Sequence, residues 1–245
     1  MKPLYDKIGV NYSSHRRPDD RIAAQIHAAL GDAETVLNVG AGTGAYEPSD
    51  RIVTAVEPST EMISQRPGNA GKVYQGVAED LPFSNNSFDT AMAVLTVHHW
   101  SDVPKGLEEM RRVATHRVVI LTFDPAAPYF WLADYIPEII DLDQPIMPAI
   151  GTFERFFQRT EVQVVPVPHD CTDGFLGAYW RRPEAYLDSS VRAAISTFAK
   201  LDDISPALER LEKDLQTGVW AKRYADIQML EQLDIGYRLV VADLT

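Results

Sequence analysis

Short apolar runs alternate with amphipathic stretches through the first half of the chain. Buried strands are predicted for five of these runs, at residues 36–39, 51–57, 72–77, 88–95 and 117–122. Helices are predicted between them, from Pro18 to Gly31, from 58–61 onward and after Asp102, where cap residues precede apolar positions at helical spacing. Because strand and helix alternate without a break, this half predicts a parallel sheet with helices on both faces.

The pattern changes after residue 124. Residues 125–160 hold five prolines among aromatic residues, which predicts irregular structure with one or two short helices. A sixth strand is predicted at 161–167, and its Pro166 limits it to a sheet edge or a strand end. Three more helices are then predicted, at 183–198, 205–218 and about 220–233, before a last strand at 237–242.

Composition narrows the classes of partner. The length of 245 residues and 45% hydrophobic content fit one α/β domain with an insertion. A net charge of −12 argues against nucleic acid or an anionic membrane as main partner. The single cysteine, Cys171, excludes an intrachain disulfide, and the histidine spacing supports no metal site. No apolar signal core and no membrane-spanning run are found, so we expect a cytoplasmic protein.

A glycine-rich turn, Val39-Gly-Ala-Gly-Thr-Gly44, follows the first predicted strand. Its glycines leave no Cβ to hold a ligand away from the backbone, and they permit positive φ. Glu57 ends the next predicted strand, 17 positions after Gly40. A strand, a glycine turn and an acid about 20 residues later are typical of a nucleoside site in which the acid binds the ribose hydroxyls. The alternative is a tight strand-to-helix turn without a ligand.

Four further motifs accompany the turn: Val56-Glu-Pro-Ser59, Gly76-Val-Ala-Glu-Asp-Leu-Pro-Phe83, Ser87-Phe-Asp89 and Val97-His-His-Trp100. Together the five resemble the class I S-adenosylmethionine-dependent methyltransferases, in the type 11, ubiquinone/menaquinone-methyltransferase-like branch that acts on small molecules. The resemblance covers about residues 1–124. It implies a Rossmann-like, seven-stranded, mostly parallel sheet with an antiparallel last strand and a helical lid.

The resemblance also implies how the domain is divided. A single domain is expected over 1–245, with a cofactor-binding half at 1–124, substrate-side insertions at 125–235 and the last strand at 236–245. Residues 125–235 match no family feature tied to one substrate. Some relatives that share this region carry an antibiotic-biosynthesis label, which hints at secondary metabolism.

The resemblance implies S-adenosylmethionine as cofactor and S-adenosylhomocysteine as product. The cofactor-binding residues that it implies in and beside these motifs are Gly40, Ala41, Gly42, Gly44, Glu57, Pro58, Met62, Ala78, Glu79 and Leu95. Glu57 would accept from both ribose hydroxyls, and Glu79 would accept from the adenine amino group. Asn38 stands where the family often has Asp, which leaves open any contact from this position to the amino group of the cofactor.

An N-terminal arm carries Tyr12 and the pair Arg16-Arg17. In relatives with this start, a tyrosine and an arginine fold over the cofactor, and the arginine pairs with its carboxylate, which suits a bidentate guanidinium. The sequence does not show which of the two arginines pairs with the carboxylate. We assign Tyr12 and Arg17 to the cofactor. The alternative is a solvated arm.

Two histidines are candidates for proton transfer from the acceptor. His98 follows the fourth strand at the edge where doubly wound sheets bind ligands, and it could act as a general base. The alternative is that His98 only shapes the pocket, since positioning can suffice for methyl transfer. His169 could line the acceptor pocket with Arg181-Arg182, or these residues could cap helices. Aromatic residues suggest an apolar lid or core packing: Tyr129, Phe130, Trp131, Phe153, Phe156 and Phe157.

The sequence therefore predicts methyl transfer from S-adenosylmethionine to a small-molecule acceptor at oxygen, nitrogen or carbon. Two alternatives remain. One is a protein that binds S-adenosylmethionine without transferase activity, because no catalytic side chain is obligatory. The other is an NAD(P)-dependent oxidoreductase, against which the GxGxG spacing argues, since dinucleotide sites use GxGxxG.

Overall fold

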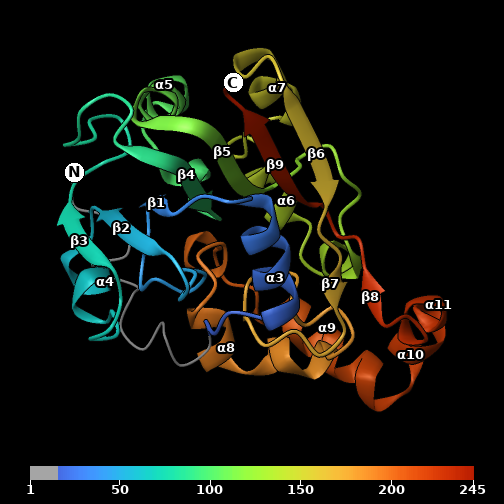
Figure 1. Cartoon of the computed structure of the whole chain (residues 1–245). Helices are drawn as coiled ribbons and strands as arrows, with labels where there is room; N and C mark the ends of the chain where they lie inside the picture. The colour runs from blue at the N-terminus through green and yellow to red at the C-terminus, as the bar shows by residue number, and fades with distance from the viewer. Residues whose placement is uncertain (1–15) are drawn as a thin grey trace.

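A seven-stranded sheet forms the centre of the molecule, in the order β3-β2-β1-β4-β5-β9-β6. The computed structural model describes residues 16–245 (Figure 1). The strands of the sheet are β1 (Thr35–Val39), β2 (Ile52–Glu57), β3 (Lys72–Gln75), β4 (Phe88–Val94), β5 (Ala114–Phe123), β6 (Thr160–Val164) and β9 (Tyr237–Asp243). All five strands predicted in the first half of the chain are present. Tyr12 lies outside the described residues.

The direction of β9 confirms the predicted fold class. Neighbouring strands from β3 to β5 pair in parallel, whereas β9 lies antiparallel between β5 and β6. The sixth strand is at the sheet edge, as its prolines predict. It is shorter than expected, because pairing with β9 ends at Val164, and Val167–Pro168 forms a separate strand, β7.

Helices cover both faces of this sheet. They are α3 (Asp20–Ala29), α4 (Thr60–Ser64) and α5 (Val103–Val113), each capped at its N-terminus by an Asp or Ser side chain. Val36 belongs to a core cluster with Ile22 of α3, whereas its neighbour Leu37 belongs to a second cluster with Leu107 of α5. Because successive strand residues point to opposite faces, α3 and α5 lie on opposite sides of the sheet.

The second half of the chain adds short helices and a third core cluster. Its elements are η2 (Trp131–Asp134), α6 (Glu138–Asp143), α7 (Ile150–Phe156), η3 (Pro183–Leu187), α8 (Ser189–Ala193), η4 (Phe198–Lys200), α9 (Ser205–Gln216), α10 (Val219–Arg223), α11 (Ala225–Gln228) and β8 (Gln232–Leu233). In Figure 1, α8 and α9 lie beyond the end of the sheet toward which β5 and β6 run. The insertions therefore face the edge where the parallel strands end.

Two predicted helices are wrong in their extent. The helix expected at 183–198 is divided into η3, α8 and η4, because Asp188 adopts an extended conformation and caps α8 with its side chain. The helix expected at about 220–233 is divided at Tyr224 into α10 and α11 and ends at Gln228, and residues 232–233 pair with β7 instead. Among residues 16–245, no helix is long and apolar enough to cross a membrane.

Candidate functional site

The glycine turn is held between two strand ends. Gly40 has a φ of +69°, and a Cβ at this position would lie 2.2 Å from the Thr96 side-chain oxygen. The N–H groups of Gly40 and Ala41 both donate to the carbonyl of Val56 at the end of β2. Gly42 and Gly44 also have positive φ. The turn therefore needs glycine for conformation and for space, as predicted.

Glu57 lies directly beside this turn at the carboxyl end of β2. Its side chain is buried, and Oε2 accepts from the Gly42 N–H at 2.8 Å while Oε1 accepts from the Ser59 N–H at 2.9 Å. Pro58, between Glu57 and the α4 cap residue Ser59, is half-buried. Two backbone donors thus orient the carboxylate at the carboxyl end of β2.

Apolar residues complete this edge of the sheet. Met62 is buried on α4, and its methyl group would lie 3.3 Å from a Cβ on Gly42. Ala78 is buried after β3. Leu95 has a φ of +52°, a conformation that is uncommon for residues other than glycine and is often found at ligand sites. The structure therefore brings these three predicted residues to the same edge as the turn.

Glu79 is engaged within the protein. Its Oε1 accepts from the Ser101 N–H, the Ser101 hydroxyl and the Asp102 N–H at 2.6–3.0 Å. Burial alone would raise the pKa of Glu79, but these hydrogen bonds outweigh it and lower the pKa. Glu79 therefore holds the segment that leads into α5, a role that the sequence did not predict. Its contact with adenine stays a prediction.

A buried polar cluster lies beneath the turn. Asn38 donates to Glu47 Oε1 at 3.0 Å, and Arg66 donates to both Glu47 oxygens at 2.8 Å. The exposed fractions of the Arg66 and Glu47 side chains are 4% and 8%. Asn38 Oδ1 is buried and has no hydrogen-bond partner among the described residues, which leaves an acceptor beside the glycine turn.

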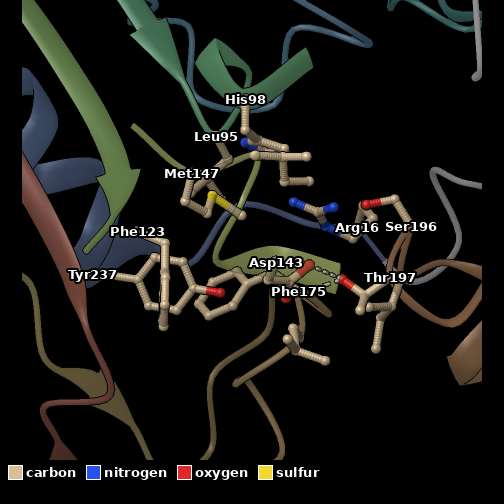
Figure 2. A pocket seen from close by; sticks show the side chains of 13 residues that line it. Arg16, Leu95, His98, Phe123, Asp143, Met147, Phe175, Ser196, Thr197 and Tyr237 are labelled. Atoms are coloured by element: carbon tan, nitrogen blue, oxygen red, sulfur yellow. Dashed lines mark hydrogen bonds between the residues drawn. The ribbon is translucent and has the colours of Figure 1, made fainter. Parts of the chain in front are cut away.

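A pocket opens next to Leu95, and its volume is about 630 Å³ including the open mouth (Figure 2). Apolar and aromatic side chains form most of its wall: Leu95, Phe123, Ile146, Met147, Phe175, Leu176, Ile195 and Tyr237. Its polar lining consists of Arg16, His98, Asp143, Ser196 and Thr197, together with the Tyr237 hydroxyl, which points into the pocket in Figure 2. A mostly apolar pocket with a few polar groups is typical of small-molecule sites.

Asp143 was not predicted. It ends α6 with 4% of its surface exposed, and it accepts from the Thr197 hydroxyl at 3.1 Å. Burial raises the pKa of Asp143 to about 6, although the Thr197 hydrogen bond and the charge of Lys200 oppose the rise. No sequence signal marks this residue among its acidic neighbours on α6, because its burial depends on segments distant in sequence.

His98 lies in the pocket, as predicted. It belongs to the one-turn helix η1 (Val97–His99) after β4, and its ring centroid is 3.9 Å from that of His99. Burial, and then the neighbouring His99, lower the pKa of His98 well below 6.5, and burial lowers the pKa of His99 to about 4. His98 is therefore neutral near pH 7.

Arg16, not Arg17, lines the pocket. Arg16 Nε is 2.6 Å from Asp173 Oδ1, and the Asp173 carboxylate also accepts from the buried Tyr46 hydroxyl at 2.8 Å. Arg17 is exposed and absent from the lining. Arg16 reaches the pocket because its partner Asp173 lies in a loop that is distant in sequence, and the assignment of Arg17 to the cofactor stays a prediction.

His169 does not lie in this pocket, contrary to the prediction. Its Nε2 is 3.3 Å from Glu231 Oε2, on the side where β7 pairs with β8. Arg181 and Arg182 are also absent from the lining, and both donate to backbone carbonyls. Their contacts are with Glu231 and with backbone carbonyls of Leu230, Cys171 and Ala178, so they do not act as the helix caps of the alternative interpretation.

The predicted aromatic lid is mostly core. Phe153 and Phe157 are buried with α5 in the second cluster, and Trp131 is buried in the third. The aromatic wall of the pocket is formed instead by Phe123, Phe175 and Tyr237, which the sequence did not single out. Within residues 16–245, no group of three or more His, Cys, Asp or Glu side chains could hold a metal ion.

Comparison with known proteins agrees with this geometry. Residues 37–121 match the family described as a methyltransferase domain. A solved structure described as a putative methyltransferase from an antibiotic biosynthesis pathway of Anabaena variabilis is 34% identical, covers 93% of this chain and 98% of its own, and has a TM-score of 0.86. The demethylmenaquinone methyltransferase of Porphyromonas gingivalis is 30% identical over 60% of this chain and 70% of its own length.

Other curated relatives match over a smaller part of their length. The 2-methyl-6-phytyl-1,4-hydroquinone methyltransferase 2 of Oryza sativa is 29% identical over 116 residues, which are 42% of this chain and 33% of that protein. The chain spans 33%, 44% and 41% of the first three curated relatives that it matches. The chain therefore matches less than half the length of each of these three relatives.

Proposed function

The chain belongs to the S-adenosylmethionine-dependent methyltransferases, and on that premise we propose that it transfers a methyl group from S-adenosylmethionine to a small-molecule acceptor. The observation that carries the proposal is the adjacency of two sites at the end of β4. Thr96 touches the glycine turn, and Leu95, the residue before it, lines the pocket. A cofactor over the turn and an acceptor in the pocket would thus meet at one point.

The residues of the turn fit the cofactor. Gly40, Gly42 and Gly44 leave the backbone open to the methionine part, and Glu57 offers both carboxylate oxygens to the ribose hydroxyls. Asn38 Oδ1 supplies an acceptor without a partner among the described residues, which suits the cofactor's amino group. When bound, the cofactor supplies a methyl group made electrophilic by the sulfonium. Ala41, Pro58, Met62, Ala78, Glu79 and Leu95 remain part of the proposed cofactor site.

The pocket suits a small acceptor with an apolar body. Phe123, Phe175 and Tyr237 would exclude water from it, and exclusion of water strengthens the electrostatic interactions at the reacting atoms. Arg16, paired with Asp173, brings a guanidinium into the lining of the pocket. His98, neutral near pH 7, is available as a hydrogen-bond partner for the acceptor. The Anabaena relative's description as an antibiotic-biosynthesis enzyme favours an acceptor from secondary metabolism.

The proposal is tested by calorimetric titration with S-adenosylmethionine, S-adenosylhomocysteine and NAD in parallel. Binding of the first two without NAD is the expected result, because the turn has the spacing GxGxG and not the GxGxxG of dinucleotide sites. Binding of NAD alone would contradict the cofactor assignment and favour an oxidoreductase.

Transfer is tested separately, by release of S-adenosylhomocysteine with a panel of small amines, alcohols, phenols and carbon acids. Release with at least one member supports methyl transfer. Cofactor binding without release for any member would favour a binding protein that lacks transferase activity.

A further inference from the structure

The acceptor pocket contains a buried carboxylate that no cation neutralises within residues 16–245. Asp143 receives hydrogen bonds only from the Thr197 hydroxyl, at 3.1 Å and 3.3 Å to its two oxygens. Arg16, the cation that shares the pocket, is paired with Asp173 at 2.6 Å. Lys200, at an exposed position, attracts the charge of Asp143 but forms no ion pair with it. Figure 2 shows Asp143 and Thr197 at one side of the pocket, with Arg16 above them.

Such a carboxylate is costly to bury. A carboxylate in an apolar environment is destabilised unless a cation, several hydrogen bonds or protonation compensates for the lost water. Asp143 has 4% of its surface exposed, and burial raises its pKa to about 6, so near pH 7 it is mostly ionised with one hydroxyl donor and no paired cation within residues 16–245. A cationic ligand in the pocket would supply the missing charge.

The walls of the pocket also suit a cation on an apolar body. Phe123 and Phe175 pack against Tyr237 with ring centroids 5.6 Å and 4.6 Å apart. Aromatic faces attract an ammonium group within about 6 Å of the ring centroid. Ile146 and Met147 extend the apolar wall next to Asp143. The pocket thus combines one negative charge with aromatic and aliphatic surfaces.

We propose that the methyl acceptor is an amine with an apolar or aromatic body, and that Asp143 binds its ammonium group and takes its proton. The inference rests on the proposed methyl transfer and adds the class of acceptor and the residue that recognises it. His98 is a poorer candidate for this role, since burial lowers its pKa well below 6.5 and its neutral ring has no charge to attract an ammonium.

The chemical step balances as follows. The ammonium R–NH₃⁺ gives one proton to the Asp143 carboxylate and becomes R–NH₂ with a free lone pair. That lone pair forms the N–CH₃ bond as the C–S bond of the sulfonium breaks, and the electron pair of the broken bond stays on sulfur. The product R–NH₂⁺–CH₃ carries the positive charge, S-adenosylhomocysteine is neutral, and Asp143 releases its proton to water.

The test compares paired ligands and paired variants in the full chain. Arylalkylamines from benzylamine to 4-phenylbutylamine, and the alcohols of the same length, are titrated into protein saturated with S-adenosylhomocysteine. At least one amine is expected to bind about tenfold or more tightly than its alcohol. Asp143→Asn is expected to remove this preference, and Asp141→Asn, at an exposed position of the same helix, is expected to keep it.

Several outcomes would overturn the inference. They are equal binding of every amine and its alcohol, an unchanged preference in Asp143→Asn, and methyl transfer to phenols or alcohols but not to amines. Titration of both variants with S-adenosylhomocysteine shows that they are folded, with affinities within about twofold of the parent chain. Failure of the parent chain itself to bind S-adenosylhomocysteine would instead refute the proposed function.

Discussion

Glu57 and Asp143 are both buried carboxylates of the site, and they differ in what satisfies them. Glu57 accepts from two backbone N–H groups that its own strand end and the glycine turn provide. Asp143 accepts from a single hydroxyl, that of Thr197. Hydrogen bonds from fixed donors stabilise an ionised carboxylate, whereas burial without them destabilises it. The protein itself therefore stabilises the ionised form of Glu57, whereas for Asp143 we propose that a ligand does so.

Replacing Glu57 by Gln should weaken S-adenosylmethionine binding by about 10- to 100-fold, because one strong charged acceptor for the ribose hydroxyls is lost. Calorimetric titration measures the change. Glu154→Gln, at an exposed position of α7, is the matched control and should leave the affinity unchanged. Equal affinity of Glu57→Gln and the parent chain would remove the ribose assignment.

Replacing Asp143 by Asn should stabilise the ligand-free protein at neutral pH. Burial raises the pKa of this carboxyl from 3.8 to about 6, so the protonated form favours the folded state. The stability that this form contributes is fully present below pH 4 and is lost as the carboxyl ionises while pH rises through 6. The variant should therefore gain about 2–3 kcal/mol at pH 7.5 and only about 1 kcal/mol at pH 4.5. Urea unfolding at the two pH values measures this difference.

The groups that face Asp143 remain the same in both proteins. Thr197, Lys200, Tyr129 and Tyr237 interact with it by hydrogen bond or charge. The control Asp141→Asn should show no such pH-dependent gain, since its side chain is exposed. A stability gain for Asp143→Asn that is independent of pH would indicate a packing effect instead of a titrating carboxyl.

Among the elements, the ends of β1, β2 and β4 decide where the site forms. The Gly40 and Ala41 N–H groups bond the carbonyl of Val56 on β2, and Thr96 after β4 fills the space beside Gly40. Three strand ends thus meet at one turn, at the point where the sheet order reverses from β1 toward β4. Ligands bind at this point in doubly wound sheets because the loops separate there.

Gly40→Ala tests this packing. The new methyl group would lie 2.2 Å from Thr96 Oγ1 in a backbone conformation with φ of +69°, so the turn must shift. We expect a loss of stability of about 1–3 kcal/mol and loss of S-adenosylmethionine binding, measured by thermal unfolding and calorimetry. Gly68→Ala has open space around its Cβ and should change neither quantity. Retained binding in Gly40→Ala would contradict a ligand lying against this turn.

At the scale of the whole molecule, an ion pair between Arg16 and Asp173 links the start of the described chain to the insertions. Arg16 forms an isolated bridge and an ion pair with Asp173, and the two residues are 157 positions apart. Asp173 is fully buried, and Tyr46 donates to it from the loop after the glycine turn. This network places Arg16 in the pocket and connects the cofactor-side half to the segment before η3.

Arg16→Gln should destabilise the protein strongly, by about 3–5 kcal/mol, because the buried Asp173 charge loses its cation. Arg17→Gln should change stability by no more than about 0.5 kcal/mol, since Arg17 is exposed. Chemical denaturation of both variants provides the comparison. Similar effects of the two substitutions would argue against the buried pair.

Much of the fold could be predicted from local pattern. The strands of the parallel half, the caps at Ser59 and Asp102 and the positive φ of the glycines depend on residues close in sequence. Helix extent was less predictable in the second half. At Asp188 the side chain caps α8 and the backbone is extended, so a local interaction ended a helix that the apolar spacing alone would have continued.

The sequence by itself determined the sheet, the glycine turn, the acid beside it and the position of His98, because each follows from spacing along one or two adjacent elements. Only the tertiary structure decided which arginine enters the pocket, that His169 lies elsewhere, and that Asp143 is buried there. Asp143 meets Thr197 across 54 positions and Arg16 meets Asp173 across 157. Burial and pairing at such separations depend on how the insertions fold onto the sheet edge, which no local pattern encodes.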